Sequence, residues 1–194
     1  MKNKPNFRDA YLYKILFSTL LFIMLAPSFA SADENPPALG ILASTSGQNN
    51  TVGIVYDFSS NFSIKPQITF YQVNTGWKTY GAALQFDSNI PVSDLFSVFY
   101  GIVIGYRYDY RYFNYSDGST IKENNNFFSA SVVLGGRCML NERFGFFADT
   151  GFAYTGEYSK DENRDTSGII TRDSTWYNIF SIRSAELGAV FYLF

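Results

Sequence analysis

The stretch FYGIVIGYRYDYRYF, which covers Phe99–Phe113, is too aromatic for a loop and yet contains three charged residues. Side chains on a β-strand point alternately to two faces. Every even-numbered position over Phe96–Tyr112 is apolar or aromatic, whereas the odd-numbered positions are small or apolar at one end and charged at the other, as Arg107, Asp109 and Arg111. The stretch is therefore predicted to be a long β-strand with one face suited to an apolar medium and the other suited to water or ion pairs.

The same alternation recurs along the chain and predicts an all-β protein. A weak run at residues 38–45 is followed by clear runs at 51–58, 63–72, 79–87, 95–113, 127–138, 143–158 and from about 175 to the C-terminus. Connections after the second, fourth and sixth runs are short, and those after the fifth and seventh, 114–125 and 159–174, are long and polar. Eight strands with this loop asymmetry predict an antiparallel up-and-down transmembrane barrel.

Residues 1–32 have the features of a secretory signal peptide. Four basic residues precede the apolar run ILFSTLLFIMLA, and Ala30-Ser31-Ala32 forms a cleavage signal. Twelve helical residues extend only about 18 Å, which is too short to cross a bilayer. Residues 33–194 are thus predicted to be the exported barrel domain. Removal of residues 1–32 leaves 11 Lys and Arg against 16 Asp and Glu, a balance that argues against nucleic acid as a partner.

Alternation does not say which face is inside, so a soluble lipocalin-like barrel with an apolar interior is the alternative. Residue size favours the membrane barrel, because large apolar residues occupy one face and small residues occupy the other. An eight-stranded barrel has a narrow interior. The small-residue face carries Gly53, Gly81, Gly101, Gly105, Gly135, Gly145 and Gly151.

The charged side chains of the small-residue face are predicted to lie in the lumen and to pair across strands, because unpaired buried charges are costly. This lumen charge network comprises Asp57, Lys65, Asp87, Arg107, Asp109, Arg111, Arg137, Asp149 and Glu157. Arg183 and Glu186 join it only if a β-bulge near Ser184 turns both inward. That bulge would also turn Phe194 away from the lipid. Without it, Val190, Tyr192 and Phe194 share the parity of Glu186, so the sequence leaves the register of the last strand open.

Catalysis and cofactor binding are not expected. The chain has no histidine and so lacks the usual general base near neutral pH. The segment DENRD at residues 161–165 imitates a calcium loop but lacks the required glycine and the final glutamate. The sequence therefore predicts no enzyme activity, no cofactor and no metal site. The single cysteine, Cys138, is expected on the lipid face.

The signal peptide, the alternating strands, the segment LGGRCMLNERFGFFADTGFAYTG (residues 134–156) and the terminal FYLF together resemble small eight-stranded bacterial outer-membrane barrels of the OmpX, Ail and opacity-like group. This resemblance implies an outer-membrane location in a Gram-negative bacterium and contact with lipid and lipopolysaccharide. It also implies insertion by the barrel-assembly machinery through the C-terminal strand, and a non-enzymatic role in adhesion to a host or environmental ligand or in envelope integrity. The alternatives are a narrow OmpW-like channel for ions or small apolar solutes and the soluble lipocalin-like barrel.

Overall fold

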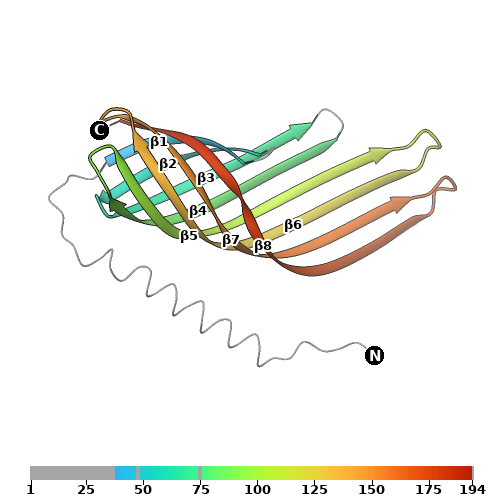
Figure 1. The fold of residues 1–194 in the computed structure, drawn as a ribbon. Helices are drawn as coiled ribbons and strands as arrows, with labels where there is room; N and C mark the ends of the chain where they lie inside the picture. Colours follow the sequence, from blue (N-terminus) through green and yellow to red (C-terminus); the bar gives the residue numbers. More distant parts are fainter. Residues whose placement is uncertain (1–37, 47–48, 74–75, 194) are drawn as a thin grey trace, which may run out of the picture.

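The computed structural model describes residues 38–46, 49–73 and 76–193, which form one closed antiparallel barrel in which each strand pairs with its neighbours in sequence and β8 pairs with β1 (Figure 1). The predicted signal peptide and Phe194 lie outside the described residues. No helix in the described part of the chain is long and apolar enough to cross a membrane. The strands are β1 Ala38–Ser46, β2 Asn49–Ser59, β3 Phe62–Val73, β4 Trp77–Pro91, β5 Phe96–Asn114, β6 Thr120–Met139, β7 Phe144–Arg164 and β8 Ile170–Tyr192.

The register of the eight pairs gives the barrel a large stagger. A line of paired residues that starts at Thr45 and runs around the wall through β2 to β7 arrives on β8 at Trp176. Thr45 itself pairs with Leu187 on the same strand. A stagger of this kind tilts the strands relative to the barrel axis and keeps the interior narrow.

The large apolar side chains point outward, as predicted from the alternation. On β7, Phe146, Phe152 and Tyr154 are 50%, 57% and 53% exposed, whereas the inward-facing Phe147 and Asp149 between them are buried. The same phase holds on β2 to β4, where bulky side chains such as Ile54, Ile68 and Leu84 lie on the outer surface. Hydrocarbon side chains on the outside and polar ones within are the arrangement of a membrane barrel rather than of a lipocalin.

Strands β5 to β8 are much longer than β1 to β4, and the predicted long loops are wrong. Most of residues 114–125 and 159–174 continues the ladders, and only residues 115–119 and 165–169 form turns. Outside a membrane both faces of a sheet meet water, so polar composition does not distinguish a strand from a loop there. Positive φ angles at Gly118 and Gly168 mark the true turns. The result is a four-stranded sheet that extends beyond the ends of β3 and β4 (Figure 1).

A β-bulge sets the register of the last strand. Asp149 pairs with Glu186 and Gly151 pairs with Arg183, so two residues of β8 lie opposite Thr150 alone. The bulge turns Arg183 and Glu186 into the lumen and Val190 and Tyr192 with them. The alternative register, with Val190 and Tyr192 on the lipid face, is wrong, because it would leave the Glu186 carboxylate in hydrocarbon.

Candidate functional site

The lumen is filled near the short turns by a first charged cluster. The Arg137 guanidinium donates through Nη1 to Asp57 Oδ2 at 3.1 Å and also to the Tyr192 hydroxyl. The Tyr192 hydroxyl in turn donates to Asp57 Oδ2 at 2.5 Å. These residues come from β2, β6 and β8, so the cluster ties three separate parts of the wall together. A cavity of about 450 Å³ lies at this end of the barrel and is bordered by the same three side chains.

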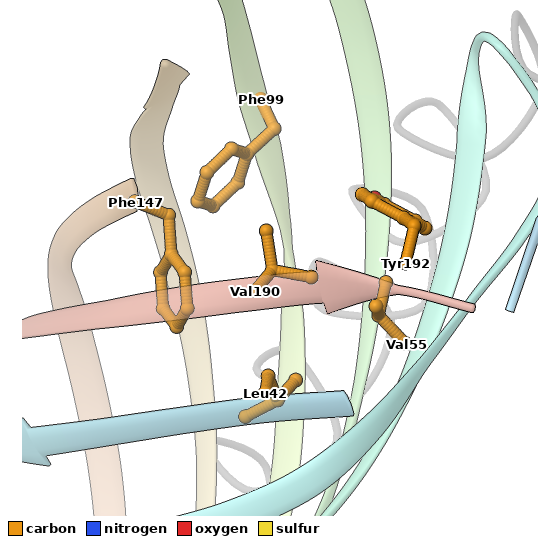
Figure 2. Packing of buried hydrophobic residues seen from close by; sticks show 6 residues of the cluster. All are labelled: Leu42, Val55, Phe99, Phe147, Val190 and Tyr192. Carbon is orange, nitrogen blue, oxygen red and sulfur yellow. The ribbon is translucent and has the colours of Figure 1, made fainter. Parts of the chain in front are cut away.

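An apolar cluster lies beside this charged cluster and was not predicted from the sequence. It contains Leu42, Val55, Phe99, Phe147, Val190 and Tyr192, all at most 7% exposed (Figure 2). Phe99 and Phe147 each face a glycine on the neighbouring strand, Gly135 and Gly188. A Cβ added at either glycine would overlap the facing ring. The glycines therefore provide the space that the two rings occupy.

A buried ion pair adjoins the two rings. Lys65 Nζ lies 2.5 Å from Asp87 Oδ2, and the two side chains are 3% and 0% exposed. The same ammonium lies 4.3 Å from the centre of the Phe99 ring and 5.4 Å from that of Phe147. Gln85 Nε2 donates to both carboxylate oxygens of Asp87 at 2.9 Å and 3.1 Å. The Asp87 carboxylate is thus held by one cation and one amide.

The β-bulge supplies a third charged cluster. Arg183 donates through Nη1 to Asp149 Oδ1 at 3.0 Å and through Nη2 to Glu186. Ser44 on β1 donates to Glu186 Oε1 at 2.5 Å. The outward-facing Thr150 hydroxyl donates to the Arg183 carbonyl at 3.1 Å, which satisfies a polar group on the lipid side of the bulge. The cluster therefore connects β7, β8 and β1 at the closure of the barrel.

The remaining predicted lumen charges lie nearer the open end, and all of them except the buried Asp109 are partly exposed. Arg107 Nε is 3.2 Å from Asp109 Oδ1, and Arg111 Nη1 is 3.5 Å from the carboxylate of Glu123, which was not among the predicted lumen charges. The two guanidinium groups also stack on aromatic rings, of Phe127 at 4.1 Å and of Trp77 at 4.4 Å. Glu157 faces inward and has no ion-pair partner among the described residues. These charges line a vestibule rather than the closed part of the lumen.

The second candidate region is the free edge of β8. From Ile170 up to the bulge, β8 pairs with β7 alone among the described residues, because its backbone pairing with β1 begins at Leu187. Every residue over 165–182 is exposed. The nine residues 174–182, STWYNIFSI, contain neither charge nor proline. Trp176, Phe180 and Ile182 project from the outward face of this edge, and Tyr177 and Ile179 project from the inner face.

Two matching turns hold the tips of the sheet in place. Asp117 Oδ1 accepts hydrogen bonds from the Ser119 amide at 2.9 Å and from its hydroxyl at 2.6 Å, and Asp165 accepts the equivalent pair from Ser167. Hydrogen bonds from these serines lower the pKa of both carboxyls below their ordinary value. The two aspartates therefore cap the turns in their ionised form at neutral pH.

Neither region contains a recognisable metal site or reactive thiol. Among the described residues no group of three or more His, Cys, Asp or Glu side chains is placed to hold a metal ion. Asp161 and Asn163 of the calcium-like segment lie within β7, and Asp165 caps the turn that follows. Cys138 faces outward and is exposed, as expected.

The comparisons with known proteins bear on the fold. No protein-family model and no curated protein matches the chain. Among solved structures, a major outer membrane protein from Thermus thermophilus is similar at 10% identity with a TM-score of 0.54, covering 82% of this chain and 100% of that protein. The N-terminal β-barrel domain of OprF from Pseudomonas aeruginosa (11% identity, TM-score 0.46, 81% and 96% covered) and CarO from Acinetobacter baumannii (11%, 0.42, 79% and 96%) also match. The closed register together with the first of these likenesses identifies the chain as a membrane-spanning eight-stranded β-barrel.

Proposed function

We propose that this protein is a non-enzymatic surface barrel of the Gram-negative outer membrane, and that its protruding sheet binds an extended polypeptide segment of a partner along the free edge of β8. The observation that most supports this proposal is the unpaired edge of β8. An unpaired strand edge presents a row of backbone donors and acceptors that can pair with another chain. Protected edges usually carry lysine, proline or a covering element; residues 174–182 contain no lysine or proline, and no strand of the described part of the chain pairs with this edge.

The side chains of the edge supply the rest of the binding surface. Trp176 and Tyr177 are 55% and 52% exposed, and they lie on opposite faces of the strand. A strand added beside β8 would place its alternate side chains against these two rings and against Ile179 and Phe180. The expected ligand is therefore an uncharged extended segment rich in β-branched and aromatic residues.

The filled lumen argues against the alternative of a channel. Three charged clusters and the apolar cluster cross the interior over the half of the barrel near the short turns. We expect refolded protein in planar bilayers to give no steady conductance. A steady conductance that is abolished by changing Arg107 or Asp149 would show that the protein is a channel. It would contradict the proposal of a surface barrel with a closed lumen.

The edge is tested by selecting peptides from a random library with the refolded protein in micelles. Thr175 on β8 and Ser159 on β7 are directly paired and lie in the same row of the inner face, but only Thr175 is at the edge. We expect Thr175→Lys to weaken peptide binding at least tenfold and Ser159→Lys to leave it nearly unchanged. Equal loss in both variants would indicate binding to the face of the sheet, and no loss in either would exclude the edge.

A further inference from the structure

The two faces of the protruding sheet, taken together with the adjoining end of β4, carry opposite net charge. The strand register assigns Lys78, Lys122, Lys160, Arg164 and Arg172 to the outward face, together with a single carboxylate, Glu162. The same register assigns to the inner face Arg107 and Arg111 against Asp109, Glu123, Glu157, Asp161 and Asp173. The outward face is thus basic and the inner face acidic, although residues 33–194 as a whole contain more acidic than basic residues, 16 against 11.

The outward cations, defined as the five basic residues of that face, are only partly neutralised. Glu162 lies between Lys122 Nζ at 3.5 Å and Arg172 Nε at 3.0 Å, so one carboxylate serves two cations. The hydrogen bond from Arg172 is the main cause that lowers the pKa of Glu162, and the charge of Lys122 adds to it. Lys78, Lys160 and Arg164 have no ion-pair partner among the residues that the structure describes. The face therefore keeps a positive charge at neutral pH.

The outward cations begin where the aromatic part of the outer surface ends. Lys160 follows Tyr158 by two residues on the same face of β7, and the Tyr158 ring lies 6.3 Å from that of Trp176 on β8. Lys78 pairs with Tyr110 on β5. Tyrosine and tryptophan gather at the boundary between hydrocarbon and headgroups. Long basic side chains just beyond this boundary reach the level of lipid phosphates with their charged ends.

We propose that the outward cations bind the phosphate groups of anionic glycolipid in the leaflet that surrounds the barrel. The lipid source follows from geometry, because the net positive charge lies on the face that continues the lipid-facing surface of the barrel. A dissolved polyanion would approach the exposed sheet from either side and would meet the acidic inner face. The bound phosphates neutralise the uncompensated cations and fix the height of the sheet above the membrane. This inference rests on the outer-membrane location in the proposed function but not on peptide binding at the β8 edge.

The test compares two charge-matched variants in phosphatidylcholine membranes. The outward variant is Lys122→Gln/Lys160→Gln, and the inner variant is Arg107→Gln/Arg111→Gln, which removes the same charge from the opposite face of the same sheet. The probe is spin-labelled lipopolysaccharide, used with its phosphates and after enzymatic dephosphorylation. The fraction of label immobilised at the protein gives its affinity relative to phosphatidylcholine. Heat-modifiable migration on a gel verifies that each variant is folded.

We expect wild-type protein and the inner variant to prefer the phosphorylated form, and the outward variant to lose that preference by about fivefold for each cation removed. An equal loss of this preference in both variants would mean that only the net charge of the protein matters, and it would contradict a lipid site on the outward face. Undiminished preference in the outward variant would overturn it as well. Peptide selection at the β8 edge is measured separately in micelles, so failure of the edge and failure of the lipid site give different results.

Discussion

At the scale of single residues, the packing of the barrel interior depends on aromatic rings that each lie opposite a glycine on the neighbouring strand. Phe99 lies over Gly135 and Phe147 lies over Gly188 on adjacent strands. Each ring reaches the centre of the lumen because the neighbouring strand has no Cβ at that position. The glycines were recognisable in the sequence as signs of a narrow interior, but their pairing with particular rings depends on register, which the sequence does not state.

Gly135→Ala is expected to destabilise the barrel by about 1 to 3 kcal/mol, because the new Cβ would overlap the Phe99 ring and the Ala148 carbonyl. Gly105→Ala is the matched control, since its closest contact would be the rotatable Ser129 hydroxyl, at 3.2 Å. Urea unfolding in detergent micelles measures both variants. Equal stability of the two would show that the space beside Phe99 is not tightly filled.

Lys65→Met is expected to lower the free energy of unfolding by about 3 to 5 kcal/mol, because it leaves the fully buried Asp87 carboxylate without its cation. The double variant Lys65→Met/Asp87→Leu removes both charges and should recover most of that loss. The same unfolding titration compares the single and double variants. If the double variant is as unstable as the single one, Lys65 stabilises the barrel through the packing of its methylene stem rather than through its charge.

At the scale of elements, the sequence predicted all eight strands and the ends of most of them at the short turns, but not the loop ends of β6 to β8. Alternation identifies a strand only where its two faces meet different media. Within the membrane the two faces of a strand meet lipid and lumen, and the predicted inward and outward positions of β2 to β7 are confirmed. Beyond it Lys122 and Glu123, neighbours on opposite faces, are both polar, so the pattern disappears although the ladder continues.

The last strand shows a second limit of the same reasoning. Its charges, Arg183 and Glu186, are an odd number of residues apart, and one unbroken strand cannot turn both inward. This conflict correctly pointed to a bulge. The choice between the two registers required the ion pairs with Asp149 and the hydrogen bond from Ser44, which join residues far apart in sequence.

The turn at Asp117 should respond to acid with a definite sign. Hydrogen bonds from Ser119 lower the pKa of this carboxyl in the folded turn, so the turn's contribution is complete above the unfolded value of about 3.9 and is lost as pH falls through the folded value. We expect the Ser119 amide proton resonance in micelles to titrate below a pH of about 3.9. Asp117→Asn keeps an acceptor and should abolish the titration. A midpoint at or above the ordinary value would contradict this account.

At the scale of the whole molecule, the barrel is divided along its axis. The half near the short turns is closed by ion pairs and by the apolar cluster, whereas the opposite half opens into a vestibule and continues as a sheet without an opposing wall. The closed half contributes stability and excludes solvent. The open half presents an edge, an acidic face and a basic face. Such a division suits a protein that presents a surface rather than a passage.

The orientation of side chains in the wall is the claim on which both proposals depend, and a nitroxide scan of β7 tests it most directly. Single cysteines are introduced over residues 146–154 on a Cys138→Ala background, labelled, and measured in lipid vesicles for collisions with oxygen and with a water-soluble nickel chelate. We predict oxygen maxima at the even positions, including Phe146, Phe152 and Tyr154, and minima at the odd positions between them. Maxima at the odd positions, with the even positions shielded from lipid, would contradict the account.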